Sequence, residues 1–106
     1  NVVTPVEEKI NVAMIIDGIR YEAAIKSGST AYDLMSLLKT ENRTNFSGKN
    51  YSDLGFFVEE INGAKNNPSG KNWLYYVNGQ PAPVGVSNYK LNNNDVLEWK
   101  YENKSF

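Results

Sequence analysis

The fold is decided by residues 10–38, which read INVAMIIDGIRYEAAIKSGSTAYDLMSLL. Apolar side chains alternate with other residues over 10–16, and a second alternating run covers 19–25. Alternation of this kind places one face of a strand against a core. The two runs are separated by Asp17-Gly18, a pair typical of two-residue hairpin turns. The stretch therefore predicts an antiparallel β-hairpin at the start of the fold.

A short helix is predicted directly after this hairpin. Thr30 stands three residues before Asp33, which is close to the capping-box pattern that begins many helices. Apolar residues then recur at helical spacing over 31–38, which predicts a helix of about 10 residues. Its apolar stripe is wide enough to need a sheet to pack on.

The rest of the chain predicts further strands joined by tight turns. Strands are expected over 55–61, 73–77 and 95–102, where apolar and aromatic residues alternate with polar ones. Asn-Gly pairs follow the first two of these strands. Residues 42–53 are polar and irregular, with at most a short strand.

A hairpin, a helix and then more strands indicate the α+β class. The simplest arrangement that buries the helix is β-grasp-like, with the N-terminal β-hairpin and one short helix packed on a mixed sheet. We expect residues 1–8 to be a linker or tail and residues 9–106 to form one domain.

Composition excludes several classes of function. The chain has 106 residues, 41% of them hydrophobic and 22% charged, and a net charge of −1. This balance offers no basic field for nucleic acid, and no apolar run approaches the ~18 residues of a membrane span. The sequence contains neither Cys nor His, which removes the usual thiolate and imidazole nucleophiles, bases and metal ligands. We expect a protein that is not an enzyme.

Two groups of polar residues are candidates for a functional site. Residues 92–95 read Asn-Asn-Asn-Asp, a row of oxygen donors without the Gly and Glu spacing of a calcium loop, so a solvated turn is expected there. Glu59 and Glu60 are adjacent on a strand and point to opposite faces, so they cannot form an acid–base pair.

A stronger candidate covers residues 73–86. A strand at 73–77 places large aromatic side chains on both of its faces, and the uncharged segment that follows is stiffened by Pro81 and Pro83. The prolines also exclude a central strand there. A stiff apolar loop beside aromatic rings loses little conformational entropy on binding. The predicted ligand-binding residues are Trp73, Tyr76, Gln80, Pro81, Ala82, Pro83, Val84, Gly85 and Val86.

Four segments carry a resemblance to a known family. GFFVEEING at 55–63, WLYYVNGQPA at 73–82, residues 85–89 and DVLEW at 95–99 are similar to the transcobalamin-like C-terminal domain. That domain occurs in bacterial surface proteins and lipoproteins and in the animal cobalamin carriers. The resemblance implies a β-grasp-like fold. It also implies a corrinoid ligand beside Trp73 and the loop 80–86, with Tyr76 as a neighbour.

We therefore expect a non-catalytic, extracellular ligand-binding module at a bacterial cell surface, after removal of a signal, and part of a larger surface protein. Cobalamin is the bound ligand that the resemblance implies. The main alternative is a structural or adhesive module that binds a protein or polymer partner. A third is a domain that binds a hard divalent cation such as calcium through carboxylate and amide oxygens.

Overall fold

The structure of the protein is a computed structural model that describes residues 8–104. Its larger sheet has five strands in the order β2-β1-β8-β6-β7. These are β1 (Lys9–Ile16), β2 (Ile19–Lys26), β6 (Asn72–Val77), β7 (Gln80–Pro81) and β8 (Val96–Glu102). Most of the tail expected at residues 1–8 lies outside the described residues.

The N-terminal hairpin is confirmed in the predicted register. Strands β1 and β2 are antiparallel, and Ile16 faces Ile19 across the turn. Both turn residues have positive φ, 48° at Asp17 and 84° at Gly18, the backbone twist that two-residue hairpin loops require. Strand β1 also pairs in parallel with β8, so the sheet is mixed and the α+β fold is confirmed.

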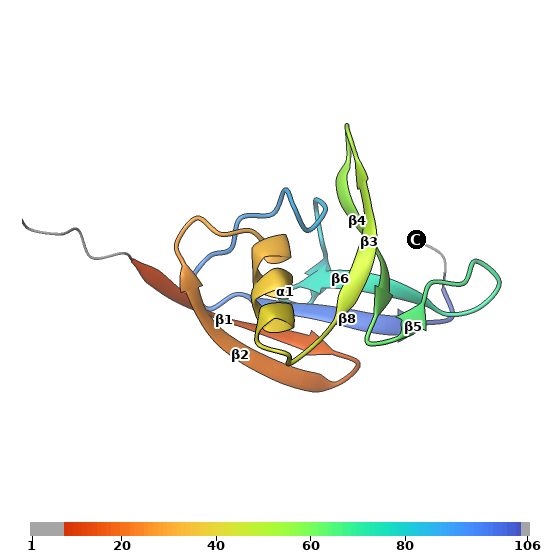
Figure 1. Ribbon diagram of the computed structural model, residues 1–106, viewed down its shortest axis with the longest axis horizontal. Helices are drawn as coiled ribbons and strands as arrows, with labels where there is room; N and C mark the ends of the chain where they lie inside the picture. Colours follow the sequence, from red (N-terminus) through yellow and green to blue (C-terminus); the bar gives the residue numbers. More distant parts are fainter. Residues whose placement is uncertain (1–7, 105–106) are drawn as a thin grey trace, which may run out of the picture.

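Helix α1 (Ala31–Thr40) lies against this sheet (Figure 1). Its start is fixed by a complete capping box: Asp33 N donates to Thr30 Oγ1 at 3.2 Å, and Thr30 N donates to Asp33 Oδ2 at 2.8 Å. Its buried stripe consists of Ala31, Leu34, Met35 and Leu38. These side chains join the core with the inward-facing residues of β1 and β8.

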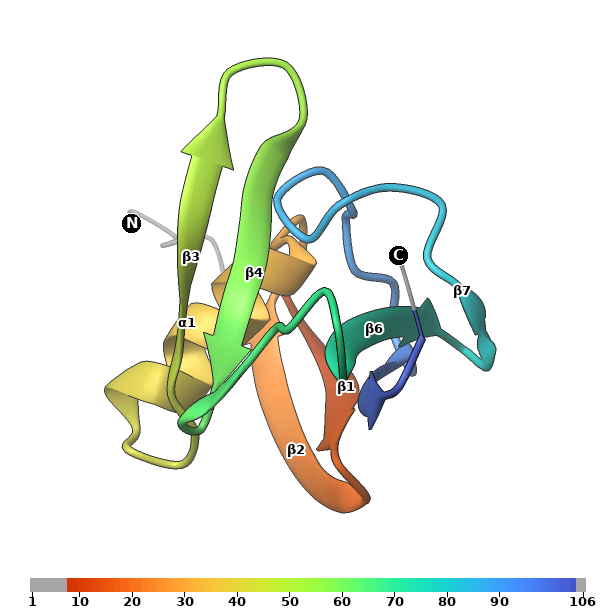
Figure 2. The ribbon, with the colours of Figure 1, turned by 90° about the vertical axis from the view of Figure 1, so that its right-hand side faces the viewer.

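A second, three-stranded sheet is present that the local sequence pattern does not predict. It has the order β3-β4-β5, with β3 (Phe46–Tyr51), β4 (Gly55–Ile61) and β5 (Ala64–Lys65). The β3–β4 hairpin crosses the molecule beside α1 and projects beyond it (Figures 1 and 2). Aromatic rings join this hairpin to the helix. The ring centroid of Tyr32 in α1 lies 5.8 Å from that of Phe46 in β3 and 4.8 Å from that of Phe56 in β4. The fold therefore has two sheets that approach each other at β4 and β6.

Within residues 8–104, no helix has the length and apolar character that crossing a membrane requires.

Candidate functional site

An apolar pocket of about 400 Å³ lies where the two sheets approach each other. Strand β4 contributes residues 56–58 to its walls, and strand β6 contributes residues 73–75. Trp99 of β8 and the loop 82–86 complete the lining. Figure 2 shows this loop passing between β4 and the end of β7. The pocket is thus built from segments that are far apart in the sequence.

Hydrogen bonds hold the loop 82–86 at both ends. At its start, Ala82 N donates to the Tyr75 carbonyl at 3.1 Å, which continues the β6–β7 pairing by one residue. At its end, the carbonyl of the buried Val86 accepts from Tyr32 N at 2.9 Å, in the first turn of α1. Residues 83–85 between these anchors are exposed. A loop fixed in this way presents its apolar side chains at little conformational cost.

The segment that follows the loop ties it to strand β4. Phe56 N donates to Ser87 Oγ at 3.0 Å, and Asn88 Nδ2 donates to the Leu54 carbonyl at 3.3 Å. The loop and the β4 wall of the pocket are therefore held together by polar contacts outside the pocket itself.

Aromatic rings form the β6 and β8 side of the pocket. Tyr75 stacks on Trp99 with ring centroids 4.8 Å apart and an angle of 19° between the planes. Trp73 packs on Tyr101 at 4.6 Å, and its indole Nε1 donates to the Ala64 carbonyl at 2.8 Å. In the β6–β8 register, Trp73 lies directly opposite Tyr101, and Tyr75 lies directly opposite Trp99. Because residues two positions apart on a strand point to the same side, the two pairs share one face of the sheet.

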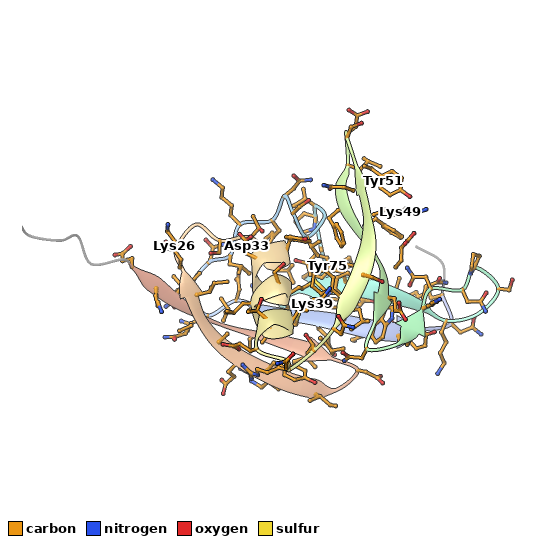
Figure 3. The ribbon with its side chains drawn as sticks, in the orientation of Figure 1. Lys26, Asp33, Lys39, Lys49, Tyr51 and Tyr75 are labelled. Carbon is orange, nitrogen blue, oxygen red and sulfur yellow. The ribbon has the colours of Figure 1, made fainter. Side chains whose placement is uncertain are left out.

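The pocket is electrically neutral. No charged side chain is among its lining residues. The Tyr75 hydroxyl and Trp99 Nε1 are both buried and have no hydrogen-bond partner among the described residues. Burial raises the pKa of Tyr75 above its ordinary value, and the nearby Tyr89 and Asp95 add to the increase. Tyr75 is therefore neutral at physiological pH. Its side chain lies in the interior, whereas Lys49 and Tyr51 lie on the projecting hairpin (Figure 3).

The structure brings together six of the nine residues that the sequence predicts for a ligand site. Trp73 and the loop residues 82–86 line the pocket. Tyr76 lies on the opposite face of β6, where its hydroxyl donates to Glu102 Oε1 at 3.1 Å and Lys100 Nζ lies 4.9 Å from its ring centre. Gln80 and Pro81 form strand β7 beside the pocket and are not part of its lining.

Sequence reasoning missed the remaining lining residues, namely Tyr75, Trp99, Leu74 and residues 56–58. Strand alternation does place Tyr75 on the same face as Trp73. The contribution of Trp99 depends on the pairing of β6 with β8, and that of β4 depends on how the second sheet packs. Neither the β6–β8 pairing nor the packing of the second sheet can be predicted from the local sequence.

The row of polar residues at 92–95 has a structural role. Both Asp95 carboxylate oxygens accept hydrogen bonds: Oδ1 from Asn78 Nδ2 at 2.9 Å, and Oδ2 from the Tyr89 hydroxyl and from Asn92 N, each at 2.8 Å. Asn93 Oδ1 accepts from Asn11 N at 2.8 Å. Across residues 8–104, no three carboxylate, His or Cys side chains come together as a metal site would require.

Comparison with known proteins identifies relatives by structure and by family. None of the curated proteins matches the sequence. The crystal structure of haptocorrin in complex with Cbi matches with a TM-score of 0.76 and 19% identity, over 94% of this chain and 27% of the haptocorrin chain. This protein thus spans about a quarter of haptocorrin. A protein of Ruminococcus gnavus ATCC 29149, described provisionally as metal binding, matches with a TM-score of 0.61 and 15% identity, over 93% of this chain and 100% of that one.

At these identities the two structures show a shared fold. They confirm the similarity to the transcobalamin-like C-terminal domain that the sequence suggested. The family described as "Domain of unknown function (DUF4430)" matches residues 28–103, from the end of β2 to the end of β8. The match covers most of the chain, and the protein therefore belongs to the DUF4430 family.

Proposed function

We propose that the protein is a non-catalytic ligand-binding module whose ligand occupies the pocket between β4, β6 and the loop 82–86. The observation that carries this proposal is the pocket itself, about 400 Å³ of space lined by aromatic and aliphatic side chains. Sites for small molecules have volumes of roughly 300–1,000 Å³ and similar linings. The loop that forms one wall is held in place by hydrogen bonds at both ends, as expected for a site that is formed before its ligand arrives.

We propose a corrinoid such as cobalamin as the ligand. About a quarter of haptocorrin shares this fold, and haptocorrin was solved in complex with Cbi, a cobalamin precursor. A corrin macrocycle is too large to enter the pocket whole, so it would lie across the mouth with one peripheral group inside. Val84 and Phe57 line the pocket and remain 44% and 39% exposed, which suits them for contact with such a ring.

In this proposal the remaining predicted residues act at the edge of the site. Gln80 and Pro81 are exposed on β7, next to the loop, and Tyr76 lies on the outer face of β6. Residues 9–106 form the binding module. In this proposal the module works outside the cell as part of a larger surface protein.

A specific observation also favours the adhesive alternative. The tip of the β3–β4 hairpin carries two exposed apolar side chains, Leu54 at 74% and Tyr51 at 46%. The hairpin projects from the molecule (Figure 1). Exposed apolar groups of this kind often mark contact with a protein partner, so this module could bind a surface partner through the hairpin.

Isothermal titration with cobalamin tests the proposed function. The variant Val84→Asp places a charge at the mouth of the pocket, at an exposed position where it should not disturb folding. We expect wild-type binding to saturate and Val84→Asp to raise the dissociation constant at least tenfold. Ile19→Asp is the matched control, because Ile19 is 59% exposed on the β1–β2 hairpin and does not line the pocket. No saturation up to about 1 mM cobalamin, or roughly −4 kcal/mol of binding, would reject the corrinoid proposal.

A further inference from the structure

A second pocket, of about 500 Å³, lies at the C-terminal end of α1. Its lining comes from three segments: Lys39 in the last turn of the helix, residues 42–45 of the connection to β3, and Asn62 in the turn between β4 and β5. Among the described residues that line it, none carries a carboxylate, whereas Lys39 and Arg43 each carry a positive charge. It shares no residue with the apolar pocket between the two sheets. This pocket therefore differs from the first in both place and charge.

The end of the helix leaves room for an anion because its carbonyl groups are already bonded. The Lys39 carbonyl accepts from Asn42 N at 3.0 Å, and the Leu38 carbonyl accepts from Arg43 N at 2.9 Å. These bonds satisfy acceptors that a helix C-terminus would otherwise present to a ligand. They also fix residues 42 and 43 against the helix.

The two cations keep free N–H groups. Arg43 donates to the Glu22 carbonyl at 2.9 Å and to Glu41 Oε1 at 3.4 Å through Nη1 alone, so its Nε and Nη2 have no hydrogen-bond partner among residues 8–104. Lys39 Nζ donates to the Phe46 carbonyl at 3.1 Å and lies 5.2 Å from the centre of the Phe46 ring, which places it between α1 and β3 (Figure 3). Since an ammonium group has three donors, two of them remain for a ligand.

Two amide side chains of the pocket also present donors. Asn62 Oδ1 accepts from Asn45 N at 2.8 Å, and Asn45 Oδ1 accepts from Phe46 N at 3.0 Å. Only the oxygen of an amide can accept from a backbone N–H, so both oxygens are used by the backbone. Both side chains are exposed, and the NH₂ group is the part of each that a ligand can bind. Together with the two cations, they give the pocket four side chains whose free groups are all donors.

We propose that this pocket binds a phosphate group, either as the free ion or as an ester. Donors from three segments can reach oxygens on several sides of a tetrahedral anion, and the two cations compensate its charge. The whole chain has a net charge of −1, so it offers no general attraction for anions, and binding must come from this local arrangement. The site does not depend on the proposed function, because the apolar pocket takes no part in it.

Titration followed in a two-dimensional ¹H–¹⁵N spectrum tests the site. The probes are inorganic phosphate, glycerol 3-phosphate, acetate and glycerol, at constant ionic strength. We expect both phosphates to saturate and to bind at least fivefold more tightly than acetate, and we expect glycerol not to bind. The signals that shift should be those of residues 39–45 and 62, including the side-chain NH₂ groups. Tighter binding of the ester would assign the site to a phosphate on a larger molecule, and equal binding would assign it to the ion.

Two variants change the charge of the pocket. Lys39→Gln removes one cation, and Asn42→Asp adds a negative charge with almost no change of shape; both positions are exposed. We expect each to raise the dissociation constant of phosphate at least fivefold. Lys49→Gln and Asn50→Asp are the matched controls, since they make the same charge changes at exposed positions of β3 that do not line the pocket. Figure 3 shows Lys49 on the projecting hairpin. Both controls should bind phosphate as the wild type does.

Three results would overturn the phosphate site. They are binding of acetate as tight as that of phosphate, an equal loss of binding in the control variants, and no saturation by phosphate up to about 10 mM. Asn42→Asp should bind cobalamin as the wild type does, so the phosphate site and the proposed function stand or fail separately. A dispersed spectrum of each variant shows that it is folded.

Discussion

The carboxylate of Asp95 joins three segments that lie apart in the chain. It accepts hydrogen bonds from Asn78 at the β6–β7 turn, from the Tyr89 hydroxyl and from the backbone of Asn92. Asp95 is only 5% exposed, so these donors replace the water that the carboxylate loses on folding. Asn78 in turn accepts from Val96 N at 2.8 Å through its side-chain oxygen. The start of β8 is thus fixed to the turn that precedes the loop 82–86.

We expect Asp95→Asn to destabilise the protein by about 2–4 kcal/mol, because the new NH₂ group presents a donor where a carboxylate oxygen accepted one hydrogen bond (Oδ1) or two (Oδ2). Urea unfolding measures the change as a lower midpoint at an unchanged slope. Asp53→Asn at the exposed hairpin tip is the control and should lie within about 0.5 kcal/mol of wild type. A small effect at Asp95 would mean that water or rearranged side chains can satisfy its donors.

The raised pKa of Tyr75 predicts how the free energy of unfolding changes in alkaline solution. Burial raises its folded-state pKa above the value of about 10 that it has in an unfolded chain. The folded protein therefore keeps the proton that the unfolded chain loses, and stability is full below pH 10 and falls as the pH rises above it. Tyr76 and Tyr89, whose pKa values are also raised by burial and by bonds to Glu102 and Asp95, act in the same direction.

The variant Tyr75→Phe should lose part of this pH dependence. At pH 7 it removes an unpartnered buried hydroxyl, so we expect stability to rise by about 1 kcal/mol. Unfolding midpoints measured from pH 8 to pH 11.5 should fall less steeply than in wild type. An identical slope in the two proteins would show that the Tyr75 hydroxyl has a partner or reaches solvent.

The elements were predictable where their signals are local. The three two-residue turns all read Asp-Gly or Asn-Gly, and each adopts positive φ at both positions. The capping box of α1 was equally predictable, from Thr30 and Asp33. The β3–β4 hairpin was not, because β3 is polar and contains a register shift between Ser47 and Gly48. Its place in the fold depends on Phe46 and Phe56 packing against Tyr32.

The candidate site was half predictable for the same reason. Trp73 and residues 82–86 lie within one short stretch whose composition favours a stiff apolar surface. Trp99 joins them only because the β6–β8 register places it opposite Tyr75. Register between strands far apart in sequence is set by how the faces pack. No motif in residues 95–102 gives that information.

Substitutions at two glycines distinguish the packing of the β3–β4 hairpin from the conformation of the β1–β2 turn. A Cβ on Gly48 would overlap the Phe57 carbonyl on β4, whereas a Cβ on Gly18 would meet no atom and would only strain a residue at φ 84°. We expect Gly18→Ala to cost about 1 kcal/mol and Gly48→Ala to cost about 2–3 kcal/mol, as overpacking does. Gly48→Ala should also weaken cobalamin binding, because β4 forms a wall of the pocket.

Titration of both glycine variants at a temperature where each remains folded gives the comparison. Reduced binding in both would attribute the effect to lost stability alone. Unchanged binding in Gly48→Ala would indicate that the position of β4 does not matter for the ligand.

At the scale of the whole molecule, the pocket lies between two sheets and has walls from both. The five-stranded sheet contributes β6 and β8, the smaller sheet contributes β4, and the loop 82–86 spans between them. A ligand that contacts all of these walls resists their separation. A ligand that binds only the folded state, at a concentration 100 times its dissociation constant, adds about 2.7 kcal/mol of stability. Because the walls come from a few defined segments, we expect the stabilisation to be greatest in those segments.

Hydrogen exchange with and without cobalamin should reveal that pattern. We expect the strongest added protection at residues 55–58 and 82–88, where the walls meet, because local opening of the loop must break contacts with the ligand. The β1–β2 hairpin does not line the pocket, so its amides should gain only the protection that comes from global stability. Added protection concentrated at the hairpin tip, residues 51–54, would instead place the ligand on the exposed apolar surface of the β3–β4 hairpin. That result would favour a module that works by surface contact over one that encloses part of its ligand.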